Sequence, residues 1–262
     1  MVVCIAVRMN SSRLPNKALA YLVEGNTVLE LLIKRISAFV DTSQIILCTT
    51  NYVIDDPLVH LATSLGISSF RGDAMDVMSR FIGATAQLDD CRNIIRVTGD
   101  NPLTDPLFMC KMANYHCMES ADYTFTNQIP RGTRCEIIGK EFLSSLHRQI
   151  IDRSKTEYMT YYLKRDFGQK RCEFFDQYLS PISCHNLTVD TLEDLRYLQC
   201  LFRNFSDPVH VPLSEIVSYI NENKLTRMLA DNCFPHQIDS LYAVASDFTY
   251  STSNRLNMNC NA

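Results

Sequence analysis

The chain has 262 residues, of which 46% are hydrophobic and 21% charged, a composition typical of a globular protein with about one or two domains. Its 25 lysines and arginines against 29 aspartates and glutamates give a net charge of −4, which argues against a globally basic nucleic-acid-binding protein. No apolar run approaches the roughly 18 residues that a membrane span needs. We therefore expect neither a membrane span nor a nucleic-acid partner.

The start of the chain and its cysteines favour a cytoplasmic protein. Met1–Val7 lacks the basic segment and the longer apolar segment of a secretory signal. Eleven cysteines, an odd number, argue against a disulfide framework, and no pair has the C-x2-C spacing of a zinc or redox site. We expect these thiols to be reduced and mostly buried.

Short strand patterns alternate with helical patterns in the first half of the chain. The expected strands are Val2–Val7, Gln44–Thr49 and Asn93–Thr98. The expected helices are Thr27–Val40, a segment from Asp56 to Gly66, Ala74–Leu88, and a helix that begins at Asp105-Pro106. This alternation predicts an α/β fold in which helices cover a mostly parallel sheet.

The pattern is less regular in the second half. The expected strands are Asp122–Thr126, Arg134–Ile138 and His185–Val189, and the expected helices are Ser154–Asp166, Thr191–Arg203 and Pro212–Asn223. We predict one α/β domain over residues 1–228. Residues 229–262 are predicted to form a C-terminal extension that is poorly ordered or makes an oligomer contact.

A basic loop follows the first expected strand. Arg8, Arg13 and Lys17 lie with two serines in a stretch of ten residues. Ligands of open parallel sheets bind beyond the C-terminal ends of the strands, and arginine and lysine suit phosphate oxygens. The loop has no glycine, so Asn10 and Asn16 are candidates for left-handed conformations. We interpret the segment as a polyanion-binding loop, and the alternative is a solvated basic turn.

Two aspartates are expected at the same edge of the sheet. Asp100 follows the strand that ends at Thr98, and Asp190 follows the strand that ends at Val189. Two carboxylates facing a phosphate-binding loop suit Mg²⁺, which takes a few carboxylates together with phosphate oxygens and water. The alternative is that Asp100 caps a turn and Asp190 caps the following helix. The combination with the basic loop favours the metal site.

Six motifs occur in order along the chain. They are Arg8-Met9-x-Ser11-Ser12-Arg13-Leu14-Pro15-x-Lys17, Thr49-Thr50-Asn51, Phe70-Arg71-Gly72, Asp76-Val77-Met78-x-Arg80, Arg96-Val97-Thr98-Gly99-Asp100-x-Pro102-Leu103 and Leu187-Thr188-Val189-Asp190-Thr191-x-Glu193-Asp194-Leu195. Together they resemble the cytidylyltransferases that activate acidic sugars, in the branch of the spore coat polysaccharide biosynthesis protein F type, which is related to acylneuraminate and 3-deoxy-manno-octulosonate cytidylyltransferases. The resemblance covers about residues 2 to 224 and implies a Rossmann-like, three-layer nucleotidyltransferase fold of the glycosyltransferase-A type.

The resemblance also implies a reaction and a set of site residues. CTP and a small acidic acceptor would give a CMP-linked product and pyrophosphate, with Mg²⁺ as cofactor, for surface glycan synthesis by a homodimer. The implied catalytic residues are Arg13, Lys17, Asp100 and Asp190, of which Asp100 and Asp190 would hold the metal. The implied nucleotide-binding residues are Arg8, Met9, Ser12, Arg13, Lys17, Thr50, Arg71, Gly72, Asp76 and Asp100. The implied acceptor-binding residues are Arg131, Arg134, Glu136 and Glu157.

Some features of the second half leave alternatives open. Arg131 and Arg134 either bind a carboxylate or phosphate of the acceptor or are surface arginines beside a strand. Tyr158, Tyr161 and Tyr162 are interpreted as helix packing rather than a base-stacking platform. Tyr158 also stands where the related branch commonly has a histidine.

Two other functions are compatible with a similar architecture. A nucleotide-sugar glycosyltransferase normally has an Asp-x-Asp metal motif after a strand, whereas Asn101-Pro102 follow Asp100 here. A non-catalytic binding protein of the same fold is disfavoured because Arg13, Lys17, Asp100 and Asp190 are all retained.

Overall fold

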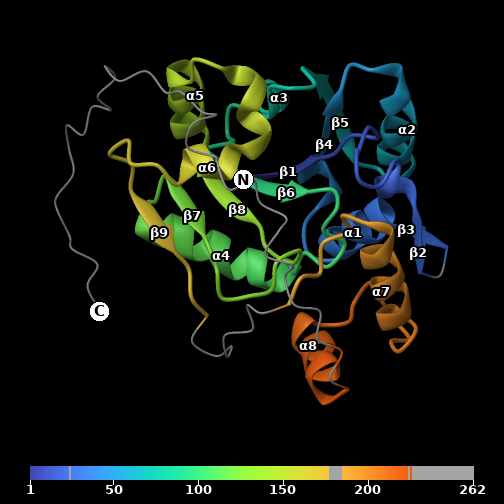
Figure 1. Ribbon diagram of the computed structural model, residues 1–262. Helices are drawn as coiled ribbons and strands as arrows, with labels where there is room; N and C mark the ends of the chain where they lie inside the picture. The colour runs from blue at the N-terminus through green and yellow to red at the C-terminus, as the bar shows by residue number, and fades with distance from the viewer. Residues whose placement is uncertain (24, 177–184, 224, 226–262) are drawn as a thin grey trace.

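A central sheet of seven strands organises the computed structural model, which describes residues 1–23, 25–176, 185–223 and 225 (Figure 1). The sheet has the strand order β5-β4-β1-β6-β8-β7-β9. Its strands are β1 (Val2–Ala6), β4 (Ile45–Thr50), β5 (Ser68–Gly72), β6 (Asn93–Thr98), β7 (Tyr123–Phe125), β8 (Glu136–Gly139) and β9 (Arg171–Glu173). A separate hairpin pairs β2 (Tyr21–Val23) with β3 (Asn26–Thr27).

Strand direction decides which residues meet at one edge of this sheet. β5, β4, β1 and β6 are mutually parallel, while β8 runs antiparallel to both β6 and β7. β9 is parallel to β7. The sheet is therefore mostly parallel, as predicted. The parallel strands end, and β8 begins, at the same edge.

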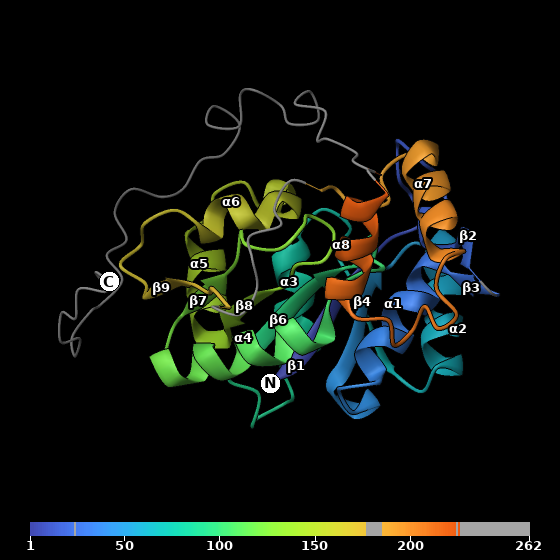
Figure 2. The same cartoon turned by 90° about the horizontal axis from the view of Figure 1, so that it is seen from below.

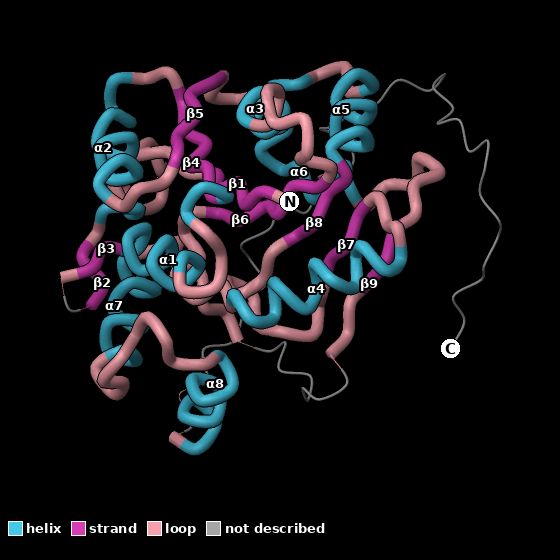
Figure 3. The backbone as a smooth tube through the Cα atoms, turned by 180° about the vertical axis from the view of Figure 1, so that it is seen from behind, coloured by secondary structure: helices cyan, strands magenta, loops and turns pink. Residues whose placement is uncertain are grey.

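Helices cover both faces of the sheet. They are α1 (Val28–Ser37), α2 (Asp56–Ser64), α3 (Val77–Ala84), α4 (Pro106–Glu119), α5 (Lys140–Gln149), α6 (Met159–Leu163), α7 (Leu192–Phe202) and α8 (Leu213–Glu222). α3, α5 and α6 lie on one face, and α1 and α4 lie on the opposite face (Figure 3). α7 packs against the β2–β3 hairpin (Figure 2). The predicted three-layer α/β architecture is confirmed.

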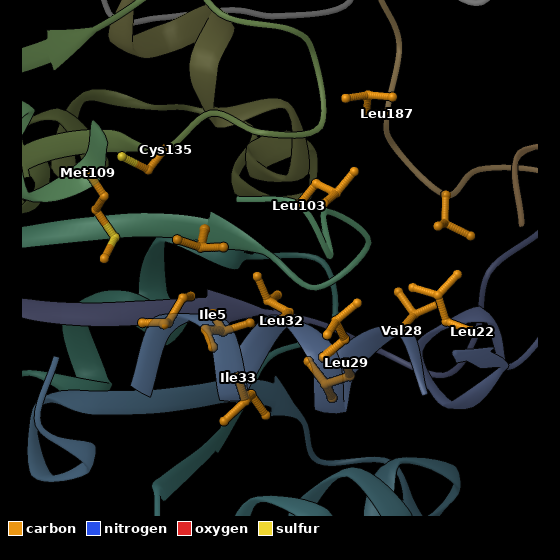
Figure 4. Packing of buried hydrophobic residues seen from close by; sticks show 14 of the residues in the cluster. Ile5, Leu22, Val28, Leu29, Leu32, Ile33, Leu103, Met109, Cys135 and Leu187 are labelled. Carbon is orange, nitrogen blue, oxygen red and sulfur yellow. The ribbon is translucent and has the colours of Figure 1, made fainter. Parts of the chain in front are cut away.

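Alternation along β1 divides the buried side chains into two cores. Val3 and Ile5 belong to the core that also contains α1 and α4, whereas Val2 and Cys4 belong to the core under α3, α5 and α6. Ile5 lies among side chains of α1 such as Leu32 (Figure 4). Because both faces of β1 are buried, the strand is apolar throughout, the pattern that predicted it from the sequence.

Two helices begin with reciprocal caps. The Thr27 hydroxyl accepts a hydrogen bond from the Glu30 backbone N–H, and the Glu30 carboxylate accepts one from the Thr27 N–H. Thr191 and Asp194 make the same arrangement at α7. Such capping boxes satisfy backbone donors that the first helical turn leaves free, so they define where α1 and α7 start.

The structure corrects several expected elements. The segment His185–Val189 is not a strand. It contacts nearby segments of the protein through an isolated bridge between Arg131 and Asn186 and through single backbone hydrogen bonds. The expected helix Ser154–Asp166 is a 3₁₀ helix, Arg153–Tyr158, followed by the short α6. α3 is shorter than Ala74–Leu88: Asp76 caps its start, and it ends at Ala84. The extension 229–262 lies outside the described residues.

Membrane and thiol features complete the description. None of the helices in the described part of the chain has the length and apolar character that crossing a membrane requires. The eight cysteines of the described residues are free thiols, and five of them are buried.

A glycine determines how closely residues 185–190 approach the strand ends. Gly132 has a φ of +90°, and a Cβ at this position would lie 2.3 Å from both the Leu187 carbonyl carbon and the Thr188 nitrogen. The Arg131 backbone on one side of this contact donates to the His185 carbonyl and accepts from the Leu187 N–H. Gly132 therefore permits the contact that positions the segment ending at Asp190.

We predict that Gly132→Ala destabilises the protein more than Gly66→Ala. Gly66 also has a positive φ, of +70°, but a Cβ added there would have no atom within 4 Å. Both substitutions carry about 1–2 kcal/mol of left-handed strain, and Gly132→Ala adds about 1–3 kcal/mol of overpacking. Urea denaturation of the two variants measures the difference, and equal losses of unfolding free energy would contradict this account.

Candidate active site

An open cavity of about 1120 Å³ lies at the edge where the parallel strands end. Its lining includes Ala6, Thr98 and Phe125, the last residues of β1, β6 and β7, and Glu136, the first residue of β8. We call it the edge cavity. Ten of the residues expected in the site line it: Arg8, Ser12, Arg13, Lys17, Asp100, Arg131, Arg134, Glu136, Glu157 and Asp190.

The loop between β1 and Lys17 folds back on itself. The Met9 carbonyl accepts hydrogen bonds from the backbone N–H groups of Ser11 and Asn16, at 2.9 and 3.3 Å. Asn16 takes the expected left-handed conformation at φ 59°, whereas Asn10 does not. Lys17 then opens the 3₁₀ helix Lys17–Leu19.

The Lys17 ammonium is the centre of the site. Its Nζ donates to Asp100 Oδ2 at 2.7 Å, to Asp190 Oδ1 at 3.0 Å and to the Val189 carbonyl at 3.0 Å. Arg13 Nη2 donates to the same Asp190 Oδ1 at 2.8 Å. The basic loop and the two aspartates, separated by 83 and 173 residues from Lys17, thus meet at one point.

The carboxylate of Asp100 is ionised although it is partly buried. Burial alone raises the pKa of Asp100, but the charge of Lys17 and the hydrogen bonds from Lys17 and Thr98 outweigh it and hold that pKa below its ordinary value. The Asp100 side chain is therefore an anion at neutral pH.

The helix-capping alternative for Asp190 is wrong. Thr191 caps α7. Its hydroxyl accepts a hydrogen bond from the Asp194 N–H at 3.2 Å, and its own N–H donates to the Asp194 carboxylate at 2.7 Å. The side chain of Asp190 instead accepts from Lys17 and Arg13. It is thus directed into the edge cavity rather than along the helix.

Arg8 and Glu157 connect the two walls of the edge cavity. Arg8 Nη2 lies 2.8 Å from Glu157 Oε1, and Arg8 Nη1 donates to the Ala74 carbonyl at 3.3 Å. Both side chains of the pair are partly exposed, at 31% and 44%. The pair is accessible to solvent and to ligands, so it is a weak contact in energetic terms.

Five residues expected at the nucleotide are not brought to the edge cavity: Met9, Thr50, Arg71, Gly72 and Asp76. The Arg71 guanidinium binds the Thr50 and Tyr52 carbonyls at 2.9 and 2.6 Å and Asp56 at 2.5 Å. Met9 and Thr50 are buried, and Asp55 accepts a hydrogen bond from the backbone N–H of each. These contacts join the ends of β4 and β5 to each other and to the loop after β1.

Asp76 is a structural junction. Its carboxylate caps α3 through the Ser79 N–H at 3.0 Å, accepts from the Thr156 hydroxyl at 2.9 Å and lies 2.6 Å from His147 Nε2. It thereby ties α3 and α5 to the 3₁₀ helix that carries Glu157.

Glu136 is bound within the protein at the end of the edge cavity where β8 begins. Arg96, Tyr123 and Thr160 all donate to its carboxylate, the Thr160 hydroxyl at 2.9 Å. Burial and the adjacent Glu136 charge raise the pKa of Tyr123 well above its ordinary value, so the phenol stays protonated and donates. The network fixes the start of β8 against α6.

Four cations surround this end of the edge cavity: Arg131, Arg134, Lys164 and Arg165. Burial and the nearby Arg131 charge lower the pKa of Arg134. Lys164 Nζ lies 4.7 Å from the centre of the Phe125 ring, and the Arg165 guanidinium lies 5.5 Å from that of Tyr161. Arg131 and Arg134 are both partly buried and line the edge cavity.

The tyrosine interpretation holds in part. Tyr162 is fully buried in the core under α6, as packing requires. Tyr161 packs against the same core and also lines the edge cavity, whereas Tyr158 lines the cavity and is 50% exposed.

Sequence reasoning missed Arg80 as a site residue. Arg80 lines the edge cavity from α3 with only 2% of its surface exposed, and burial lowers its pKa. Its Nη1 donates to the Cys48 carbonyl at 3.2 Å, while its Nε has no hydrogen-bond partner among the described residues. The signal was present, because Arg80 lies one helical turn after Val77 on the apolar side of α3.

Comparison with known proteins places the whole arrangement in a family. A sequence profile described as cytidylyltransferase matches residues 2–195. The chain belongs to the cytidylyltransferase family. The spore coat polysaccharide biosynthesis protein SpsF of Bacillus subtilis (strain 168) is 30% identical over 227 residues, which cover 84% of this chain and 93% of SpsF.

Solved structures share the fold of this cytidylyltransferase. A cytidylyltransferase from Leptospira borgpetersenii serovar Hardjo-bovis (strain JB197) has a TM-score of 0.79 at 24% identity, over 86% of this chain and 94% of that one. A CMP:2-keto-3-deoxy-manno-octonic acid synthetase solved in complex with CTP has a TM-score of 0.58 at 13% identity, over 78% and 98%. These likenesses confirm the predicted nucleotidyltransferase fold.

We predict that Glu136→Gln destabilises this cytidylyltransferase more than Glu157→Gln. Glu136 has 11% of its side chain exposed and its loss leaves Arg96 without its carboxylate partner, a cost of about 1–3 kcal/mol. Glu157 belongs to an exposed pair worth less than about 1 kcal/mol. Urea midpoints and slopes provide the comparison. The reverse order would show that the Glu136 network does not stabilise the fold.

Proposed function

We propose that this cytidylyltransferase transfers CMP from CTP to a small acceptor that carries a carboxylate or a phosphate, with release of pyrophosphate. The acceptor we favour is an acidic sugar used in surface glycan synthesis. The meeting of Lys17 with Asp100 and Asp190, at 2.7 and 3.0 Å, carries the proposal. It combines phosphate-binding cations with oxygen ligands at the ligand-binding edge of a nucleotidyltransferase fold.

The residues present are compatible with a Mg²⁺ ion. Two carboxylates and the Val189 carbonyl converge on the position of the Lys17 ammonium, a set of hard oxygen donors that already surrounds a cation. Among the described residues no group of three or more His, Cys, Asp or Glu side chains forms a metal site. A pair of carboxylates suits Mg²⁺, which completes its coordination with substrate phosphates and water. Asp100 and Asp190 would hold the ion, which would neutralise charge on the phosphates.

The proposed reaction is a displacement at the α-phosphorus of CTP. An acceptor oxygen forms a bond to the α-phosphorus, and the bond from that atom to the oxygen bridging the β-phosphorus breaks, so pyrophosphate leaves. Arg13 and Lys17 would bind the phosphate oxygens on which negative charge develops, and Ser12 would donate a hydrogen bond. Preorganised cations of this kind lower the barrier because they are already in place when the charge moves.

The acceptor would lie at the end of the edge cavity formed by Phe125 and the loop before β8. Arg131 and Arg134 carry two neighbouring positive charges there, and Lys164 adds a third above the Phe125 ring. An anionic acceptor relieves the repulsion between these cations. Glu136 would act by positioning Arg96 and the start of β8, because its own carboxylate already accepts three donors.

Arg80 is proposed to recognise the base. Cytosine presents O2 and N3 as adjacent acceptors, which matches the paired donors of a guanidinium, whereas uracil carries a hydrogen on N3. Ala6, Val7 and Val77 line the same cavity as Arg80, and their small or apolar side chains suit a planar ring. A buried Nε without a partner is costly, and a ligand carbonyl would satisfy it.

The cytoplasmic location and the homodimer predicted from the sequence remain proposals. The free thiols of the described residues support a reducing compartment.

We expect Asp100→Asn to lower CTP-dependent pyrophosphate release about 100-fold or more, because the amide removes the negative charge shared by Lys17 and the proposed cation. The assay supplies each nucleoside triphosphate, Mg²⁺ and a panel of sugar acids and phosphorylated acceptors. Asp90→Asn, at an exposed position away from the edge cavity, is the matched control. Absence of CTP binding and of turnover in the unmodified protein would refute the proposed function.

Replacement of Arg80 by Met should lower the preference for CTP over UTP by about 10- to 100-fold, the effect of one hydrogen bond from a charged group. Arg203→Met, an exposed position after α7, should leave the preference unchanged. The ratio of kcat/KM for the two nucleotides separates recognition from general loss of activity. An unchanged ratio in Arg80→Met would assign base selection to other groups.

A further inference from the structure

Lys17 uses all of its hydrogen-bonding capacity inside the protein. An ammonium has three donors, and Nζ of Lys17 binds Asp100 Oδ2, Asp190 Oδ1 and the Val189 carbonyl. Its side chain is 14% exposed, and those of the two aspartates are 24% and 13% exposed. The ammonium therefore occupies a partly buried cage of three oxygens.

The residues of this cage are also those that would bind Mg²⁺ and the phosphates of CTP in the proposed reaction. The carboxylates that bind Lys17 are those that would hold Mg²⁺, and Lys17 itself would bind the phosphates of CTP. Lys17 cannot donate to a phosphate while all three donors remain on the protein, and the carboxylates cannot fully bind a divalent ion while the ammonium lies between them. Arg13 adds a second cation on Asp190, but it is 50% exposed and more strongly screened by solvent.

We propose that Lys17 is a placeholder for the divalent cation, so that the cation and the nucleotide bind cooperatively. This inference rests on the proposed function. Free divalent ions compete with the ammonium for Asp100 and Asp190 and bind weakly. Nucleotide phosphates attract Lys17 away from the carboxylates and open them to the cation. Thermodynamic linkage then requires the cation to strengthen nucleotide binding by the same factor.

A lysine is well suited to this exchange. Its ammonium is a compact point charge on a flexible stem, whereas a guanidinium is a wide planar fork that suits fixed bidentate pairing. Lys17 also starts a 3₁₀ helix directly after the left-handed Asn16, so its backbone is fixed while its side chain can change partners. The exchange requires rotation of one side chain and no displacement of a strand.

Metal binding to the protein without nucleotide tests the placeholder directly. Mn²⁺ is the probe, and its dissociation constant is measured by electron paramagnetic resonance and by calorimetry. Lys17→Met and Lys17→Gln should both bind Mn²⁺ more tightly than the unmodified protein, by about 5- to 150-fold, the usual range of a coupling between sites. Adding Asp100→Asn to Lys17→Met should remove the gain.

Lys170→Met is the matched control. Lys170 also donates to a carboxylate and a backbone carbonyl, both of Glu119, but it lies outside the edge cavity. Its Mn²⁺ affinity should equal that of the unmodified protein. Circular dichroism and thermal melting establish that the variants are folded.

The outcomes separate this inference from the proposed function. Unchanged or weaker Mn²⁺ binding in both Lys17 variants would overturn the placeholder, as would loss of folding in both, since the ion pairs would then be structural. Pyrophosphate release from CTP by the unmodified protein is measured independently. Tighter Mn²⁺ binding in the variants without any CTP turnover in the unmodified protein would uphold the cation exchange and refute the proposed reaction.

Discussion

The ion pairs of Lys17 join three segments that are distant in the sequence: the loop after β1, the end of β6 and residues 185–190. They require β1 and β6 to be parallel neighbours, because only then do the loop and Asp100 emerge at the same edge. They also require Gly132, whose lack of a side chain lets the third segment approach. The two cores pack against both faces of these strands. The Lys17 ion pairs therefore depend both on the sheet and on Gly132.

The elements that the sequence predicted well are those with strong local patterns. β1, β4 and β6 are apolar because they are buried in the middle of the sheet, and α1 has both its amphipathic face and its cap. β5 was not predicted because Ser68–Gly72 lies at the sheet edge and is polar and partly exposed. Residues 185–189 have the apolar pattern of a strand because Leu187 and Val189 are fully buried. The backbone hydrogen bonds of this segment are made with Arg131 and Asp100, which are distant in the sequence, so the local pattern of apolar residues does not predict them.

The same distinction applies to the site: residues in strong local patterns were predicted, and contacts with residues distant in the sequence were predicted less well. The basic loop and Asp100 were predictable, since parallel strands end at a common edge. Asp190 lies at the predicted edge of the sheet, although the strand predicted before it is absent. The Val189 N–H donates to the Asp100 carbonyl, so the segment runs beside the end of β6. Arg71 and Asp76 were predicted at the nucleotide. Their side chains contact backbone carbonyls and neighbouring elements of the fold, which the sequence pattern does not show. Arg80 was not predicted as a site residue, although it stands in a recognised motif, because a position on the buried side of a helix does not by itself show that a cavity lies there.

The reversed direction of β8 has a consequence for how the walls of the edge cavity are built. The loop that carries Lys17 and the turn that carries Asp100 leave the parallel strands β1 and β6, whereas residues 126–135 connect β7 to the antiparallel β8. Substitution of Arg131 or Arg134 would change the charge of this wall without touching Lys17 or Asp100, whereas Gly132 in the same loop is needed for the close approach of residues 185–190. The same edge of the sheet therefore carries a set of ion pairs that depends on the fold and a charged wall whose side chains can vary separately from it.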